Sequence, residues 1–145
     1  MECTLKELEA LSYRISKKIK KGHSIYLHGN LGSGKTAFTK LLIGHFFKSH
    51  NKKQPLVTSP TFNIVQYYLV NSKLMIAHYD LYRIKNKKDL DHIGLYELES
   101  QVISIIEWPE LIKKKNKNRI EIKLEHTNFK NKRDVKIKYF GKIKK

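Results

Sequence analysis

The residues best suited to chemistry lie in one glycine-rich stretch, GNLGSGKT, which runs from Gly29 to Thr36. It matches the pattern G-x-x-x-x-G-K-[ST] at every fixed position. In this pattern the glycines let backbone amides surround an anion, and the helix that follows directs the positive end of its dipole at the same point. The lysine reaches the β- and γ-phosphates, and the next hydroxyl is a ligand for Mg²⁺. The stretch therefore predicts a phosphate-binding loop, with Lys35 and Thr36 as its functional side chains.

Two acidic residues could complete such a site. Asp80 follows the apolar stretch IAHY, and Glu107 follows VISII. Open α/β sheets bind ligands at the carboxyl ends of their strands, and nucleotide hydrolysis needs an acid for the metal and a group that orients the attacking water. Each residue could instead be a solvated strand end. Beside a phosphate-binding loop, the pair predicts that at least one of them is functional.

Two further features each have two interpretations. The stretch SPTF, from Ser59 to Phe62, carries hydroxyls that could sense a γ-phosphate, but a simple proline turn before a strand explains the same residues. Trp108 directly follows Glu107, and a lone tryptophan is more often a packing residue than a ligand contact.

The hydrophobic pattern predicts the elements around the loop. Leucine and isoleucine recur at helical spacing through the first twenty residues, which predicts an amphipathic helix ending near Gly22. SIYLH, residues 24–28, has the branched apolar character of a buried strand, and TAFTKLLIGHFF, residues 36–47, has a helical pattern. The order of strand, glycine-rich turn and helix is the one that a phosphate-binding loop requires.

Downstream, most of the chain has the pattern of strands. NIVQYYLV and KLMIAHYD predict a hairpin joined at Asn71 and Ser72, and residues 86–100 predict one or two short helices. VISIIE has the continuous apolar character of a central strand.

The last two strands are predicted from IEIKLEH and DVKIKYF, which alternate apolar and polar residues as an antiparallel pair with one solvated face does. We therefore expect an α/β fold of the P-loop NTPase-like, three-layer type, with a mixed central sheet flanked by helices.

Length and composition predict a single domain over residues 1–145, because 145 residues that are 40% hydrophobic can form one core but not two; with its phosphate-binding loop this would be a single P-loop domain. No apolar run approaches the roughly 18 to 20 residues that a membrane span needs, and the N-terminal stretch does not have the apolar block of a signal peptide. The single cysteine, Cys3, excludes an intramolecular disulfide. We expect a cytoplasmic protein that does not engage a membrane.

The formal net charge of +17 has two interpretations. A basic surface attracts nucleic acid through counterion release. However, only four of the 30 basic residues are arginine, and proteins that read bases or phosphates specifically favour the arginine fork. An excess of lysine together with many Ile and Asn residues is also what compositional drift of a genome would produce. The sequence leaves both a functional basic face and a compositional effect open.

Four motifs together resemble one family in their order and spacing. GNLGSGKT, SPTF, HYDLYR and IEWPE are similar to motifs of the bacterial TsaE family, formerly YjeE, and the resemblance covers nearly the whole chain. It implies a partner-stimulated ATPase of tRNA threonylcarbamoyladenosine biosynthesis. Such a protein works with TsaB and TsaD, which transfer a threonylcarbamoyl group to the adenosine beside the anticodon of tRNA. It hydrolyses Mg-ATP to permit repeated turnover.

The resemblance also implies which residues form the site. Lys35, Asp80 and Glu107 would be catalytic, with Asp80 near the γ-phosphate, and Thr36 and Glu107 would hold Mg²⁺. The residues expected to contact ATP are Thr4, Asn30, Leu31, Gly32, Ser33, Gly34, Lys35, Thr36, Ala37, Thr61, Trp108 and Arg133. Of these, Thr4 and Arg133 would contact the nucleotide base. Asn30 and Ser33 differ from the residues that are commoner in the family, at variable positions of the loop.

Two other functions remain open. A small-molecule kinase would share the phosphate-binding loop, although such kinases usually clamp the transferred group with arginines of a lid, and this chain has only four arginines. A non-catalytic nucleic-acid-binding module would account for the high charge. Arg83, three residues after Asp80, could be a further charge of the site or part of a salt bridge.

Overall fold

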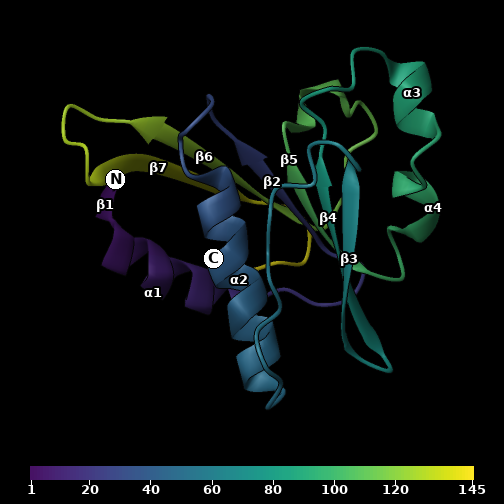
Figure 1. Ribbon diagram of the computed structural model, residues 1–145, viewed down its shortest axis with the longest axis horizontal. Helices are drawn as coiled ribbons and strands as arrows, with labels where there is room; N and C mark the ends of the chain where they lie inside the picture. The colour runs from purple at the N-terminus through teal and green to yellow at the C-terminus, as the bar shows by residue number, and fades with distance from the viewer.

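The computed structural model describes residues 1–145 and contains one mixed sheet with helices on both faces (Figure 1). The strands are β1 (Glu2–Thr4), β2 (Ser24–His28), β3 (Val65–Asn71), β4 (Leu74–Asp80), β5 (Ile103–Glu107), β6 (Arg119–His126) and β7 (Lys132–Tyr139). The helices are α1 (Leu5–Ser16), α2 (Lys35–Ser49), α3 (Lys87–Asp91) and α4 (Leu95–Leu98), with a 3₁₀ turn η1 (Pro109–Leu111). None of these helices combines the length and the apolar character that a membrane crossing requires.

The sheet has the strand order β1-β7-β6-β2-β5-β4-β3. Its centre is parallel, because β2 pairs in parallel with both β5 and β6, and β4 pairs in parallel with β5. The outer pairs β3/β4, β6/β7 and β1/β7 are antiparallel. This arrangement confirms the expected mixed sheet, the hairpin, the central position of β5 and the closing antiparallel pair.

The register of the central strands determines which residues meet at their carboxyl ends. Asp80 at the end of β4 is the direct partner of Glu107 at the end of β5, and Glu107 is also the partner of Leu27 in β2. Because these strands are parallel, the loops that leave them share one edge of the sheet. Two acidic residues that are 27 positions apart in the sequence thus become neighbours beside the loop that follows β2.

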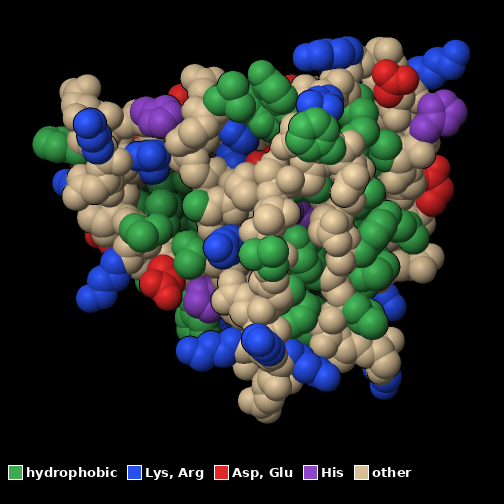
Figure 2. All heavy atoms as spheres, viewed as in Figure 1, with side chains coloured by type: hydrophobic (Ala, Val, Ile, Leu, Met, Phe, Trp, Pro, Cys, Tyr) green, Lys and Arg blue, Asp and Glu red, His purple; other side chains and the backbone are tan.

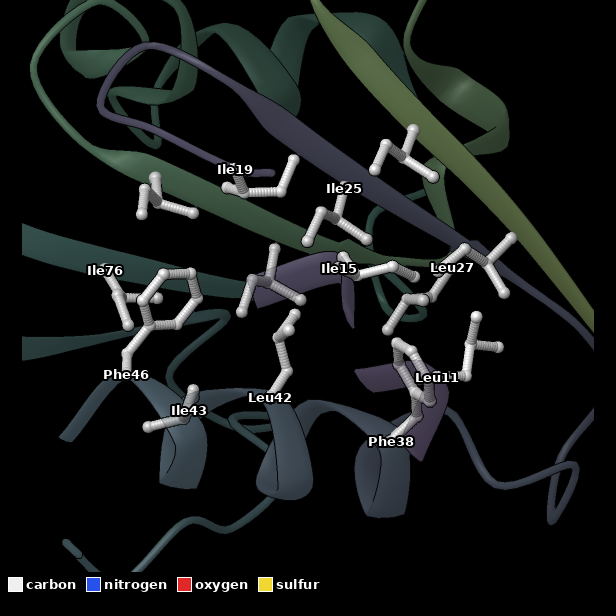
Figure 3. Close-up of a cluster of buried hydrophobic side chains, with 14 of the residues drawn as sticks. Leu11, Ile15, Ile19, Ile25, Leu27, Phe38, Leu42, Ile43, Phe46 and Ile76 are labelled. Carbon is white, nitrogen blue, oxygen red and sulfur yellow. The ribbon is translucent and has the colours of Figure 1, made fainter. Parts of the chain in front are cut away.

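One face of the sheet is covered by the two long helices. Figure 3 shows Phe38, Leu42 and Phe46 of α2 directed at the sheet, where they meet side chains such as Ile25 and Ile76. Helix α1 adds Leu8, Leu11 and Ile15 to the same cluster. The amphipathic spacing of both helices is satisfied by this one layer, which fixes α2, and with it the start of the helix at Lys35, against the sheet.

The opposite face is covered over only part of its width. Tyr26, Tyr79 and Ile106 pack there against Leu90 of α3 and Leu95 of α4. The β6/β7 pair keeps this face open to solvent, with exposed lysines alternating with the buried residues of the other face, as the sequence pattern predicts.

The expectation of one helix through the first twenty residues was wrong at both ends. The chain begins with β1, which pairs with β7, and the Thr4 side chain and Glu7 form a capping box that starts α1 at Leu5. Leu5 therefore lies in the first turn and is 66% exposed. The helix ends at Ser16, and Ile19 reaches the core from the turn that follows.

A pair of leucine substitutions tests this assignment of the core. Leu42 is fully buried between α2 and the sheet, whereas Leu56 is 83% exposed. We expect Leu42→Ala to lower the free energy of unfolding by about 2 to 5 kcal/mol because it removes buried methyl groups and leaves a cavity. Leu56→Ala should change it by less than about 0.5 kcal/mol. Urea denaturation followed by circular dichroism measures both values, and equal losses would contradict the assignment.

Candidate functional site

The glycine-rich loop connects the end of β2 to the start of α2 at the carboxyl edge of the parallel strands. Gly34 precedes the helix with a φ of 104°, a conformation that L side chains rarely adopt. At Gly29 a Cβ atom would overlap the carbonyl oxygen of Leu124 and the hydroxyl of Ser33. Glycine is thus required at both positions, and the loop is held tightly against β6.

The ammonium group of Lys35 folds back over this loop. Its Nζ donates to the carbonyl oxygens of Gly29, at 2.6 Å, and Asn30, at 2.9 Å. Burial lowers the pKa of Lys35, and the carboxylates of Glu107 and Asp80 act in the opposite direction. Lys35 is therefore a partly desolvated cation that donates to neutral carbonyl oxygens. Because an anion accepts such hydrogen bonds more strongly, it could replace these carbonyls.

Glu107 links the start of α2 to strand β4. The hydroxyl of Thr36 lies 3.0 Å from both carboxylate oxygens, and Nε2 of His78 lies 2.8 Å from Oε1. Because the carboxylate can only accept, we assign the imidazole proton to Nε2. Glu107 and His78 are both buried, so this contact fixes the carboxylate beneath the start of α2.

Asp80 is held by the loop that precedes β3. Its Oδ2 accepts from the hydroxyl groups of Ser59, at 2.7 Å, and Thr61, at 3.2 Å, and its Oδ1 accepts from the backbone amide of Tyr82 at 3.1 Å. The SPTF stretch is thus more than a proline turn, because both of its hydroxyls anchor it to an acidic residue of the site. Any movement of this loop would release two of the three donors to Asp80.

Trp108 lies across the opening between the loop and the sheet. Its φ of 58° is in the left-handed region, which is uncommon for a bulky residue and occurs most often at functional sites. This backbone turn places the indole ring 4.1 Å from Nζ of Lys35 and 4.9 Å from the ring of Tyr82. The tryptophan therefore contacts the one lysine of the loop through a cation–π interaction.

These groups surround a cavity of about 330 Å³. It is lined by Leu31, Gly32, Gly34, Lys35, Thr36, Ala37, Ser59, Thr61, Asp80, Tyr82, Glu107 and Trp108. All of these except Ser59 and Tyr82 are site residues that the sequence predicts. His78 was missed as well, although it lies two residues before Asp80 in HYDLYR and so points to the same side of β4.

The remaining expected site residues lie outside this cavity. Ser33 is buried within the loop, and Asn30 borders a neighbouring hollow. Arg133 donates from Nε to the carbonyl oxygen of Ser33 at 3.1 Å, so it braces the loop from β7. The hydroxyl of Thr4 is engaged with Glu7 at the start of α1, one residue beyond the partner of Arg133 in β1. Contacts of these residues with a nucleotide stay predictions.

A larger hollow of about 740 Å³ lies on the open face of β6 and β7. Its walls include Glu121, Lys123, Glu125 and Lys136, which are already joined in ion pairs with one another or with neighbouring cations. The loop contributes only Gly29 and Asn30 to it. The smaller cavity is the better candidate, because Lys35, Thr36, Asp80 and Glu107 all converge there.

The oxygen atoms of Thr36 and Glu107 fit a hard cation such as Mg²⁺, which binds hydroxyl, carboxylate, phosphate and water oxygens. No group of three or more His, Cys, Asp or Glu side chains is arranged to hold a metal ion. Two protein oxygens leave most of an octahedral shell open, which suits an ion that arrives with phosphate groups and water.

Ligand binding in this cavity can be followed by tryptophan fluorescence, because Trp108 contacts Lys35 and is the single tryptophan of the chain. We expect titration with Mg-ATP to give a saturable change in tryptophan fluorescence, since an anion that recruits Lys35 removes its ammonium group from the indole ring. The Lys35→Ala variant should lose this change, whereas Lys48→Ala, at the far end of α2, should retain it. An unchanged spectrum in the native chain at millimolar Mg-ATP would contradict this assignment of the site.

His78 offers a second test, because it is the buried donor to Glu107. We expect His78→Ala to lower the free energy of unfolding by about 1 to 3 kcal/mol, since it leaves a buried carboxylate without one donor. The same variant should weaken Mg²⁺-dependent binding of ADP about 10-fold or more, as loss of groups that orient metal ligands does. Thermal unfolding and calorimetric titration measure the two effects, with the exposed His92→Ala as the control. Full retention of Mg²⁺-dependent binding would contradict a positioning role.

Comparison with known proteins agrees with this geometry. A family model described as "Threonylcarbamoyl adenosine biosynthesis protein TsaE" matches residues 3–135. Proteins named tRNA threonylcarbamoyladenosine biosynthesis protein TsaE from Rickettsia felis and Rickettsia prowazekii are 36% identical over 107 residues and 35% identical over 108 residues. Each alignment covers 74% of this chain, and they cover 60% and 72% of the two relatives.

A solved structure supports the fold. The crystal structure of Bacillus subtilis YdiB matches with a TM-score of 0.72 at 24% identity, covering 97% of this chain and 86% of that one. The likeness confirms the three-layer α/β architecture. The family model and the Rickettsia relatives lead to one conclusion: this chain belongs to the TsaE family of tRNA threonylcarbamoyladenosine biosynthesis proteins.

Proposed function

We propose that this chain binds Mg-ATP and hydrolyses it to ADP and phosphate, as one P-loop ATPase domain over residues 1–145. In this proposal the hydrolysis supports repeated turnover of threonylcarbamoyl transfer to tRNA by TsaB and TsaD in the cytoplasm. The observation that carries it is the convergence of Lys35, Thr36, Asp80 and Glu107 in one cavity, from two strand ends and a helix start. Membership of the family supplies the link to tRNA modification.

The loop and the start of α2 would bind the triphosphate. Backbone amides from Leu31 to Ala37 and the amino end of the helix favour anionic groups there. Lys35 would exchange its carbonyl partners for oxygens of the β- and γ-phosphates, and Thr36 and Glu107 would hold Mg²⁺. When bound, the ion would neutralise charge that develops on the phosphate oxygens.

Asp80 is the group best placed to act on the attacking water. It is buried, and Ser59, Thr61 and the Tyr82 amide hold its carboxylate in one orientation. A carboxylate fixed in this way can accept a hydrogen bond from water and align its oxygen with the γ-phosphorus atom. The bond formed joins the water oxygen to phosphorus, the bond broken joins phosphorus to the β–γ bridging oxygen, and the water proton leaves with phosphate.

The hydroxyl groups of the SPTF stretch give a physical basis for stimulation by partners. Phe62 is 81% exposed, and Arg83 lies 4.2 Å from its ring, so the outer side of this stretch is accessible while its inner side holds Asp80. A partner that contacts the outer side can alter the position of Asp80. We therefore expect a low rate for the chain alone.

Phosphate release with and without TsaB, TsaD and tRNA tests the proposal. We expect slow release by the chain alone and stimulation when all three are added, without any added acceptor molecule. Asp80→Asn should lower kcat by about 10²-fold or more while ATP still binds, because only the orientation of water is lost. Lys35→Ala should abolish both ATP binding and phosphate release, whereas Lys48→Ala should behave as the native chain does.

The same measurement distinguishes the alternatives. A small-molecule kinase would form a phosphorylated product only with an acceptor present. A non-catalytic nucleic-acid-binding module would keep its function after Lys35→Ala. Absence of any stimulation by the partners would count against the proposed function.

A further inference from the structure

We infer that the end of the molecule opposite the glycine-rich loop is a docking surface for the phosphate backbone of a folded RNA. This surface, here called the basic end, consists of residues 14–23, 113–119 and 141–145. The inference extends the proposed function, and it rests on that function only for the identity of the RNA. Its support comes from the charges that these three segments bring together.

The sheet topology places the three segments at one end. Residues 14–23 precede β2, residues 113–118 precede β6, and Arg119 begins β6; these two strands are parallel. Strand β7 runs antiparallel to β6, with Tyr139 opposite Ile120, so residues 141–145 leave the sheet at the same end. The glycine-rich loop follows the other end of β2. The length of the strands, about 3.3 Å per residue, therefore separates the two surfaces.

Specific contacts hold the segments against one another. Buried Asn116 donates through Nδ2 to the carbonyl oxygen of Gly22 and to the hydroxyl of Ser24. The carbonyl oxygen of Asn118 accepts from the amide of Ser24, and its Oδ1 accepts from the amide of Lys142. Lys18 donates to the carbonyl oxygen of Lys144. The basic end is therefore a surface of fixed shape and not three independent tails.

The charge of this surface is of one sign. The three segments contain thirteen of the 30 basic residues and no Asp or Glu. They are Arg14, Lys17, Lys18, Lys20, Lys21, Lys113, Lys114, Lys115, Lys117, Arg119, Lys142, Lys144 and Lys145. Only Lys115 and Arg119 form ion pairs, both with Glu121. The remaining cations of the basic end have no carboxylate partner.

Compositional drift alone does not account for this arrangement. Such drift would spread lysines over the surface, and Lys and Arg side chains are indeed spread over the face drawn in Figure 2. However, all 13 acidic residues fall outside the three segments, so much of the positive charge elsewhere is offset, whereas at the basic end only Lys115 and Arg119 are paired with a carboxylate. A concentrated field of this kind attracts polyanions and releases their counterions.

The chemistry of the surface favours RNA backbone over other polyanionic partners. Its cations are almost all lysines, which contact phosphates as point charges and do not read bases as arginine forks do. A membrane-binding surface would present apolar side chains for insertion. Among the large exposed hydrophobic residues, two border the basic end: Tyr13 beside Lys17, and Met1, which lines a hollow with Arg14, Lys18 and Lys145. Two such side chains are few beside thirteen cations. The assembly of this family acts on tRNA, which supplies folded stems with closely spaced phosphates.

A charge reversal with a matched control tests the inference. The test variant is Lys113→Glu, Lys114→Glu and Lys117→Glu, which leaves Lys115 and its ion pair intact. The control is Lys85→Glu, Lys87→Glu and Lys88→Glu, three exposed lysines around the start of α3. Both variants lower the net charge equally. Binding of labelled unmodified tRNA to the full chain is measured by fluorescence anisotropy over a series of KCl concentrations.

We expect the test variant to bind tRNA at least about 10-fold more weakly at low salt. The slope of the logarithm of the association constant against the logarithm of the salt concentration should fall by about 2 to 3, because roughly one unit is lost for each phosphate that a lysine no longer neutralises. The control should keep the native slope. Basal phosphate release should be unchanged in both variants, because neither set touches the ATP cavity. Loss of tRNA binding with intact ATPase activity therefore separates this inference from the proposed function.

Two outcomes would overturn the inference. Equal weakening by both variants would show that only the net charge matters. Unaltered tRNA binding in the test variant, or tighter binding of the native chain to anionic phosphatidylserine vesicles than to tRNA, would assign the basic end to another role.

Discussion

The contact between Glu107 and its two neighbours is the interaction on which the candidate site depends. Thr36 belongs to the glycine-rich loop and its helix, His78 belongs to β4, and Glu107 ends β5 between them. A carboxylate buried at this depth is tolerated only when its oxygens accept hydrogen bonds. The requirement therefore ties the helix start to two strands, and it fixes the distance between the glycine-rich loop and the acidic edge of the sheet.

The same edge of the sheet gives a physical basis for the proposed stimulation by partners. Asp80 is oriented by hydroxyls from a surface stretch, whereas Glu107 is oriented from within the sheet. The group proposed to bind the metal is therefore rigid, and the group proposed to align water depends on a stretch that is exposed on its outer side. Trp108 also contributes to this edge. Its left-handed backbone holds the indole ring over Lys35, whose ammonium group donates at the same time to carbonyl oxygens of the loop.

The two ends of the sheet carry different chemistry for a topological reason. Parallel strands collect the loops that follow them at one end and the segments that precede them at the other. The carboxyl ends of the strands carry the glycines, hydroxyl groups and acidic residues of the candidate site. The segments at the amino ends carry lysines and no acidic residues. Because the length of the strands separates the two surfaces, the two proposed ligands, Mg-ATP and RNA, would not overlap.

The sequence alone determined the place of the glycine-rich loop between a strand and a helix, the order of strands and α-helices from β2 onward and the positions of Asp80 and Glu107 at strand ends, because these depend on local spacing and hydrophobic period. The residues of the SPTF stretch left a simple proline turn equally open, and it was the resemblance to the family that predicted Thr61 as a site residue. Only the tertiary structure decided that Ser59 holds Asp80, that His78 holds Glu107 and that Thr4 is engaged at the start of α1. It also decided that the lysines of three distant segments share one surface. These facts depend on strand register and on contacts between residues far apart in the chain, which no local pattern encodes.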